Sequence, residues 1–338
     1  MVGATGAVGE TLLRVLEERR IPIDRLGVFA SHPRSRAARF RGDLLDVAPT
    51  SEEALQPYSV VFFAGGEGAS ERFVPSIVDR GAVVIDNSAT FRMREDVPLL
   101  IPEINGGVAG REHRIFPVAN CTAIILCMAL APLREVAGLR AVRVATYQAV
   151  SGAGKAALEA FDRAEGNVVR NVVPHVGAAF DENGESGEER KVREETRKML
   201  ALPDLFVSSM CVRVPVRTAH SEAVFFETER ETSIEEMAEA FERAPSVVFH
   251  RDGIVTPREV EGSDEVHVAR LRTEIPYASL DLAQRSRASL ARDDKSKSPG
   301  RTAGRYFSLW CVGDQLRKGA ATNAVQILEL LMAKGYVR

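Results

Sequence analysis

The stretch Arg114-Ile-Phe-Pro-Val-Ala-Asn-Cys-Thr-Ala-Ile124 predicts a strand that leads directly into a helix. Residues 114–119 have the apolar character of a buried strand, and a helix pattern runs from Thr122 to about Ala131. Cys121 lies at the junction, where unpaired backbone N–H groups and the helix dipole favour negative charge. This setting is expected to lower the pKa of Cys121, which makes the thiol a candidate nucleophile. On position alone, a small buried apolar cysteine is the commoner interpretation.

Upstream of this junction, strand patterns alternate with turns and helix patterns. Residues 26–31, 60–64 and 82–85 are predicted strands, and a helix is predicted over 69–80. This alternation indicates an α/β fold with a parallel sheet and helices on its faces. Ligands of such sheets bind beyond the carboxyl ends of the strands, where residues 65–68 and 86–88 would lie.

The N-terminal sequence Met1-Val-Gly-Ala-Thr-Gly-Ala-Val-Gly9 is a glycine-rich turn before a helix pattern with Leu12, Leu13 and Leu16 on one face. Such a turn lets backbone approach a pyrophosphate at a helix N-terminus, although a plain glycine-rich turn is the alternative. Only Met1 and Val2 precede the turn, so the first strand of the sheet is expected to be nearly absent. A truncated and a wrongly assigned start are both open explanations.

The residues at the end of the predicted strand 26–31 indicate whether the cofactor is NAD or NADP. NAD-binding versions of this fold place an acidic residue there, whereas this chain has Ser31-His-Pro-Arg-Ser-Arg36. Two arginines and no acid suit a 2′-phosphate and therefore predict NADP. A solvated basic loop is the alternative.

The second half of the chain has a different pattern. Strands are predicted over 142–150, 207–216, 223–228 and 306–312, and helices over 155–164, 188–200, 233–244 and 319–332. The strands 207–216 and 223–228 are expected in an antiparallel sheet, with His220 at the turn between them as a candidate acid–base group. The composition of residues 281–304 predicts an exposed loop.

Composition narrows the class of protein. The chain has 338 residues, 45% hydrophobic and 27% charged, with a net charge of −3, which suits two soluble domains without a nucleic-acid or membrane partner. No apolar run reaches the roughly 18 residues that span a bilayer. The four cysteines form no C-x-x-C pair, so neither a metal site nor a disulfide framework is expected, and a reducing cytoplasm fits best.

Six segments, in order along almost the whole chain, resemble the aspartate-β-semialdehyde dehydrogenase family. They are Gly3-Ala-Thr-Gly-Ala-Val-Gly9, Asn120-Cys-Thr122, Tyr147-Gln-Ala-Val-Ser-Gly-Ala-Gly154, Cys211-Val-Arg-Val-Pro215, Ala219-His-Ser-Glu222 and Lys318-Gly-Ala-Ala321 with Asn323. Individually, only the blocks 147–154 and 213–220 are specific. In combination, the six segments are specific for this family.

The resemblance implies a fold like that of glyceraldehyde-3-phosphate dehydrogenase. A Rossmann-type NADP-binding domain would comprise 1–120 and 319–338, and an α+β catalytic and dimerisation domain would comprise 121–318, with a low-complexity insert near 275–304. A homodimer or homotetramer is implied. The implied reaction is the reversible reduction of L-aspartyl-4-phosphate by NADPH to L-aspartate 4-semialdehyde, NADP and inorganic phosphate. The product feeds lysine (through diaminopimelate), threonine and methionine synthesis.

The resemblance also assigns roles to single residues. Cys121 would form a thioester, His220 would act as general acid and base, and Gln148 would orient the acyl intermediate. The implied cofactor-binding residues are Gly3, Thr5, Gly6, Ala7, Val8, Gly9, Ser31, Arg34, Ser35, Ser151, Gly152 and Asn323.

Five further residues would bind the substrate. Arg213 would pair with the α-carboxylate, and Glu188 would accept from the α-amino group. Lys191, Arg92 and Asn120 would hold the phosphate, although Arg92 on its own is equally consistent with an exposed loop arginine. The other charges of the helix that carries Glu188 are expected to be solvated.

Three alternatives remain at this point. N-acetyl-glutamyl-phosphate reductase has a related fold, but its substrate lacks the free amine that Glu188 with Arg213 would recognise. A non-catalytic homologue would be expected to lose Cys121, His220 or Gln148. A fragment deficient in cofactor binding is suggested by the short first strand. Departures from the family pattern are Ala119, where proline is usual, a shortened stretch before Pro174 and the insert.

Overall fold

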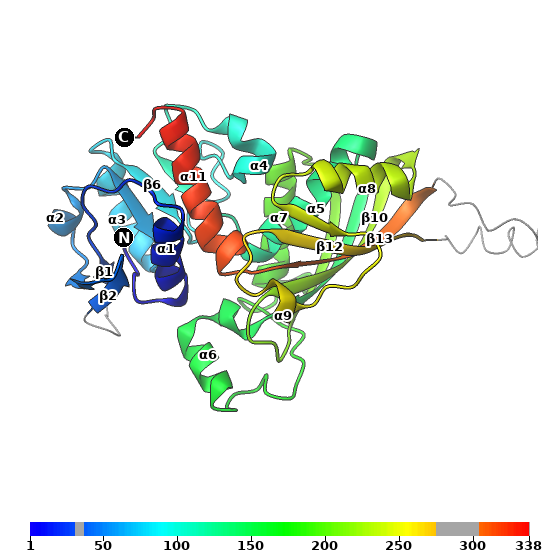
Figure 1. Ribbon diagram of the computed structural model, residues 1–338, viewed down its shortest axis with the longest axis horizontal. Helices are drawn as coiled ribbons and strands as arrows, with labels where there is room; N and C mark the ends of the chain where they lie inside the picture. Colours follow the sequence, from blue (N-terminus) through cyan, green and yellow to red (C-terminus); the bar gives the residue numbers. More distant parts are fainter. Residues whose placement is uncertain (31–36, 275–303, 338) are drawn as a thin grey trace, which may run out of the picture.

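The computed structural model describes residues 1–30, 37–274 and 304–337, and it has the expected α/β fold (Figure 1). The predictions for Ser31, Arg34 and Ser35, and for the insert up to residue 303, lie outside the described residues. Two sheet systems are present, one formed by the first third of the chain and the other by its middle and late segments.

The first sheet is parallel and incorporates the N-terminus. Its order is β4 (Ala48–Pro49), β1 (Phe29–Ala30), Val2, β5 (Val60–Phe63), β6 (Val83–Asp86) and β7 (Ile115–Pro117). Val2 forms parallel bridges to both Phe29 and Phe63, and its N–H donates to the Phe62 carbonyl at 2.8 Å. The first strand is therefore reduced to a single bridging residue, which still joins the two halves of the sheet.

Helices cover both faces of this sheet, which explains its continuous apolar strands. Phe62 of β5 packs in a core that includes α1 (Ala7–Glu18) and α11 (Thr322–Ala333). Phe63 points to the other face, where it packs with α3 (Glu67–Val78). In Figure 1 α11, at the end of the chain, lies beside α1 and β6, which it contacts.

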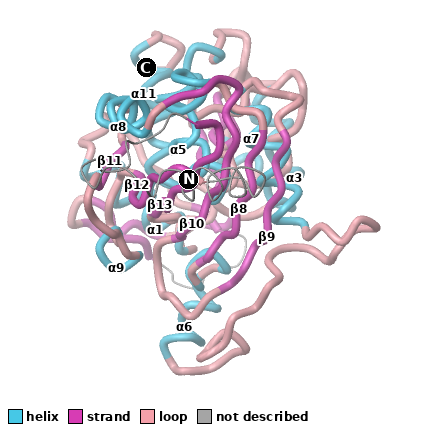
Figure 2. Tube along the Cα trace, turned by 90° about the vertical axis from the view of Figure 1, so that its right-hand side faces the viewer, coloured by secondary structure: helices cyan, strands magenta, loops and turns pink. Residues whose placement is uncertain are grey.

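The second sheet is mixed. Its order is β11 (Val247–His250), β12 (Val266–Thr273), β13 (Gly304–Gly313), β10 (His220–Thr232), β8 (Ala141–Gln148) and β9 (Phe206–Arg213). Three helices pack against it: α5 (Cys121–Ala137), α7 (Gly187–Leu200) and α8 (Ile234–Arg243). Figure 2 shows β13, β10, β8 and β9 running side by side.

Several short elements complete the described chain. They are the hairpin β2 (Ala37–Phe40) and β3 (Asp43–Asp46), α2 (Glu52–Leu55), α4 (Pro102–Asn105), a 3₁₀ turn at Gly106–Val108, another at Val150–Ala153, α6 (Lys155–Asp162), α9 (Pro257–Val260) and a π-helix at Arg317–Ala321. The sequence reasoning missed the hairpin, β11, β12 and α9. These pieces are too short, or too mixed in polarity, to show a clear period.

Two expectations about the second half were wrong. The sheet that holds β9 and β10 is mixed and not antiparallel, because β8 lies between them and pairs parallel with β9 and antiparallel with β10. His220 is not at a turn, because it is the first residue of β10 and is fully buried. The N–H of Ala219, the residue before the strand, donates to the Gln315 side chain at 2.8 Å.

Helix bounds also differ from the predictions. Helix α5 begins at Cys121 and continues through Pro132 to Ala137, beyond the predicted end at Ala131. Almost the whole helix is buried between its neighbours, and this packing overrides the unfavourable proline. The closing helix starts with a π-helical turn before α11. The capping box that begins α8, with Ser233 and Glu236, is confirmed.

The packing supports a division into two domains. Helix α11 contacts α1, α4 and β6, whereas α5, α7 and α8 contact the second sheet. We propose that residues 1–120 with 319–338 form one domain and 121–318 the other.

The glycine turn before α1 gives a first test. A Cβ at Gly9 would lie 2.2 Å from the Gly3 carbonyl oxygen and 2.8 Å from Ala4 Cα, so Gly9→Ala forces backbone apart. We expect it to lower the free energy of unfolding by about 1–3 kcal/mol, measured by urea denaturation. Gly68→Ala is the matched control, because a Cβ at Gly68 meets nothing within 4 Å, in the first turn of α3. Equal stability of the two variants would contradict the packing argument.

Candidate active site

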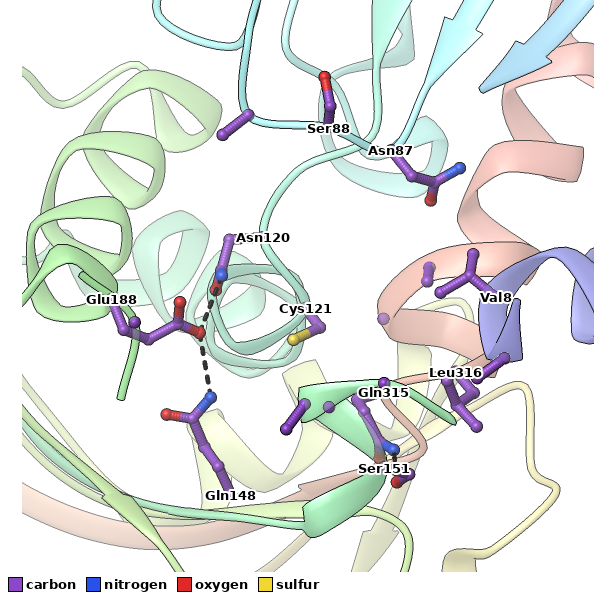
Figure 3. Close-up of a pocket in the computed structure, with 18 of the residues that line it drawn as sticks. Val8, Asn87, Ser88, Asn120, Cys121, Gln148, Ser151, Glu188, Gln315 and Leu316 are labelled. Carbon is purple, nitrogen blue, oxygen red and sulfur yellow. Dashed lines mark hydrogen bonds between the residues drawn. The ribbon is translucent and has the colours of Figure 1, made fainter. Parts of the chain in front are cut away.

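A cavity of about 690 Å³ lies beyond the carboxyl ends of the first sheet, where that sheet meets β8, β10 and α7. Segments from the first, middle and last parts of the chain line it: residues 6–8, 87–89, 92, 119–121, 148, 151–155, 188 and 191, 213 and 220, 315–316 and 319–320. The structure thus brings together all the predicted catalytic and substrate-binding residues. Figure 3 shows the Cys121 thiol at the N-terminus of its helix, facing the space between the labelled residues.

Cys121 is the first residue of α5, and Asn120 caps the helix by accepting from the Ala123 N–H at 3.1 Å. The expected lowering of the Cys121 pKa is wrong for this unliganded structure. Burial, and next the Glu188 carboxylate, raise the pKa of the Cys121 thiol to about 12, while Thr122, Arg213 and Arg92 act in the opposite direction. The thiol is therefore protonated until a bound ligand or a proton acceptor changes its surroundings.

Glu188, at the start of α7, joins two of the predicted residues. Its Oε1 accepts from Asn120 Nδ2 at 2.9 Å and from Gln148 Nε2 at 3.0 Å, as the dashed lines in Figure 3 show. Gln148 in turn accepts from the Thr146 hydroxyl at 3.2 Å. The two amides are thus fixed in orientation by one carboxylate that is 6% exposed.

His220 and Arg213 lie together in the cavity wall, beside Gly152. The Ala149 N–H donates to His220 Nδ1 at 3.0 Å, so Nε2 carries the proton of the neutral ring, and this buried nitrogen has no partner among the described residues. Burial and the Arg213 guanidinium hold the pKa of His220 well below its ordinary value. A Cβ at Gly152 would lie 2.9 Å from the His220 ring and 3.0 Å from Arg213 Nη1, so only glycine leaves room for both.

The charged helix α7 is less solvated than expected, and this corrects the sequence interpretation. Glu195, 1% exposed, accepts from Arg92 Nη1 at 3.0 Å and from the Asn120 N–H at 2.6 Å. Glu189 accepts from the Cys211 N–H, and Lys198 Nζ donates to the carbonyl groups of residues 92, 94 and 97. Glu195 was missed because its partners are far away in sequence. Its position seven residues after Glu188, on the same helix face, was the available signal.

Gln315 is a second residue that the sequence reasoning missed. Its Oε1 accepts from the Ala219 N–H at 2.8 Å, and its Nε2 donates to the Ser151 hydroxyl (Figure 3). Ala219 has a φ of +68°, a conformation that L-residues rarely adopt, and it directly precedes His220. Gln315 thereby fixes the strained backbone that places the imidazole.

The predicted cofactor residues fall into two groups. Gly6, Ala7, Val8, Ser151 and Gly152 line the cavity. The other predicted cofactor residues that the structure describes do not line this cavity. Gly3 packs against the backbone at Ala64, and Gly9 packs against Gly3. Thr5 faces a neighbouring cavity, and Asn323 is fully buried. Asn323, in the first turn of α11, donates to the Leu100 carbonyl at 3.3 Å.

The turn at Gly6 fits an anionic ligand. Gly6 is the N-cap of α1 and offers no side-chain cap, so the first N–H groups of the helix have no capping side chain to bond to. Gly6, Ala7 and Val8 all line the cavity. This is the geometry in which a helix N-terminus binds a pyrophosphate.

The fold and the cavity define an α/β enzyme in which a glycine-rich nucleotide turn and a cysteine face one cavity. Comparison with known proteins gives the same class of protein. The family models for "Semialdehyde dehydrogenase, NAD binding domain" and "Semialdehyde dehydrogenase, dimerisation domain" match residues 1–110 and 130–282. The chain is 37% identical to the aspartate-semialdehyde dehydrogenase of Aquifex aeolicus, over 100% of this chain and 98% of that protein. It belongs to the aspartate-semialdehyde dehydrogenase family.

Comparison with solved structures also finds aspartate-semialdehyde dehydrogenases. The crystal structure of aspartate semialdehyde dehydrogenase II from Vibrio cholerae matches with a TM-score of 0.86 and 34% identity, covering 98% of this chain and 97% of that one. A second structure of that enzyme, complexed with ASA, matches with a TM-score of 0.85 and 34% identity over the same shares. Among the described residues, no helix is long and apolar enough to cross a membrane.

The raised pKa of Cys121 gives a second prediction. A thiol with a pKa of about 12 is almost entirely protonated at pH 7, so alkylation by iodoacetamide should be slow and should accelerate about tenfold per pH unit up to pH 10. The rate is measured by mass spectrometry of the Cys121 peptide, and the buried Cys127, Cys211 and Cys311 serve as internal references. A rate that is already constant above pH 7 would show a lowered pKa and contradict the electrostatics described above.

Proposed function

We propose that this protein catalyses the reversible, NADPH-dependent reductive dephosphorylation of L-aspartyl-4-phosphate to L-aspartate 4-semialdehyde. The observation that carries the proposal is the position of Cys121 in one cavity between the uncapped turn at Gly6 and the charged pair Glu188 and Arg213. The Vibrio cholerae relative complexed with ASA supports the substrate class.

The reaction is divided between few residues. Attack by the Cys121 sulfur on the acyl carbon forms a thioester and breaks the bond between that carbon and the bridging phosphate oxygen, so phosphate leaves. Because the thiol is protonated, its proton leaves with the departing phosphate as hydrogen phosphate. A reduced nicotinamide cofactor bound at the Gly6 turn would supply the hydride that the thioester carbon accepts. Expulsion of Cys121, which regains a proton, then releases the aldehyde.

His220 suits the role of proton donor in these steps. The N–H of Ala149 occupies Nδ1, so the imidazole presents Nε2–H and donates to the oxygen that becomes negative at the reacting carbon. In the reverse direction the same nitrogen recovers this proton. Gln148, fixed by Glu188, orients the acyl group.

Charges around the cavity match the ends of the substrate. The Arg213 guanidinium, steadied by a 2.6 Å bond from Nη1 to the Ala149 carbonyl, pairs with the α-carboxylate. Glu188 accepts from the α-amino group, which distinguishes this substrate from an N-acylated one. Lys191, Arg92 and Asn120 bind the phosphate.

The proposed preference for NADP has support in a neighbouring cavity of about 540 Å³. Thr5, Arg14, Arg39 and Lys155 line it, together with Glu10 and Glu17. Two guanidinium groups suit a 2′-phosphate.

We propose that the enzyme acts in the cytoplasm, on the route to lysine, threonine and methionine.

A homodimer is proposed from the open face of the second sheet. Tyr147, Phe206, Met210 and Phe225 are all exposed, Met210 by 60%. The register places Phe225 beside Arg143, and Met210 beside Ala145, on this outer face. An apolar face of this extent, in a part of the chain that matches a dimerisation domain, suits a second copy. A tetramer would add a further contact between such dimers.

The function is tested by phosphate-dependent NADP reduction with L-aspartate semialdehyde. We expect activity in the parent chain and a loss of about 10⁴-fold or more in kcat for Cys121→Ala, because the variant has no nucleophile. NADP binding, followed by thermal shift, should be unchanged in the variant. A parent chain that binds NADP but has no activity would overturn the substrate assignment.

The dimer is tested with Met210→Glu, which places a charge on the outer face of β9. We expect the dimer dissociation constant to rise at least about 100-fold in sedimentation equilibrium, because the charge would be desolvated in the interface. Ile254→Glu is the control, since Ile254 is 72% exposed on a loop away from this sheet face. Unchanged association of Met210→Glu would exclude this face.

A further inference from the structure

We infer that Glu195 is a positioning residue that holds both the phosphate-binding Arg92 and the backbone in front of Cys121. One buried carboxylate would then set the distance between the leaving-group site and the nucleophile. The inference rests on the proposed function for the role of Arg92, and it goes beyond that function because it adds a residue that touches no reactant.

The contacts of Glu195 are specific and short. One oxygen accepts from Arg92 Nη1 at 3.0 Å, and the other accepts from the Asn120 N–H at 2.6 Å. The side chains of Glu195 and Arg92 are 2% and 9% exposed. Arg92 Nη2 also donates to the Asn87 carbonyl at 2.8 Å, so the guanidinium is held from two sides.

Helix α7 holds Asn120 at two points. Glu188 binds the Asn120 side chain, and Glu195, two turns further along the helix, binds its backbone N–H. Asn120 is the residue before Cys121 and caps α5. A shift of α7 would therefore move the nucleophile, and a shift of Glu195 would move Arg92 with it.

Two alternative roles make opposite predictions for phosphate binding. If Glu195 only neutralises Arg92, its removal increases the positive charge felt by phosphate and strengthens binding. If Glu195 positions Arg92 and Asn120, its removal frees the guanidinium and weakens binding. The loss of a charge-assisted hydrogen bond corresponds to roughly tenfold or more in affinity.

The experiment measures the phosphate KM in the oxidative direction for Glu195→Gln. Glutamine keeps the shape of the side chain but has one acceptor oxygen, so it satisfies only one of the two donors. We expect the phosphate KM to rise about tenfold, the aldehyde KM to change less than twofold, and kcat to fall. Glu195→Asp, which keeps the charge but is too short to reach both partners, should give the same pattern.

Glu189→Gln is the matched control. Glu189 lies on the same helix, is 7% exposed and accepts from the Ser186 and Cys211 N–H groups, away from Arg92 and Asn120. It should leave the phosphate KM within about twofold of the parent value. A lower phosphate KM in Glu195→Gln, or an equal rise in the Glu189→Gln control, would overturn the positioning role.

A second readout does not depend on turnover. Phosphate bound at Arg92 should protect Cys121 from iodoacetamide, and the protecting concentration should rise about tenfold in both Glu195 variants. If the parent shows phosphate protection but no oxidation of the semialdehyde, the proposed function fails while the role of Glu195 is still measured. Protection that is identical in the parent and both variants would overturn the inference. Circular dichroism and thermal unfolding establish that each variant is folded.

Discussion

The site depends on the buried carboxylates of one helix. Glu188 and Glu195 hold the side chain and the backbone of Asn120, and through it the start of α5 where Cys121 lies. A buried carboxylate is stable only when its oxygens accept hydrogen bonds, so the donors that surround these two groups are fixed in turn. The hydrogen bonds that the buried carboxylates of α7 require therefore fix the geometry of Gln148, Arg92 and Cys121.

The same burial sets the protonation states. It keeps Cys121 as a thiol and His220 as a neutral ring in the unliganded protein. A protonated thiol is less open to oxidation than a thiolate would be. The strained Ala219, held by Gln315, indicates that the position of His220 also carries a conformational cost.

The nucleotide-binding sheet shows how little of a strand is needed to keep the order of the others. Val2 bridges Phe29 and Phe63, and the hydrogen bonds around it connect β1 to β5. Gly9 and Gly3 allow the turn and α1 to pack on this short segment. The uncapped N-terminus at Gly6 is therefore still presented to the cavity.

The sequence by itself determined the α/β class, the strand-to-helix junction at Cys121 and the glycine turn, because these follow from local periodicity and turn chemistry. The resemblance supplied the names of the residues that meet in the cavity, and the comparisons support the family. Only the tertiary structure decided that β8 separates β9 from β10, that His220 begins a buried strand, and that Asn323 faces the core. It also decided the contacts of Glu195 and Gln315, and the raised pKa of Cys121. Burial and long-range hydrogen bonds set these features, and both arise between segments that no local pattern connects.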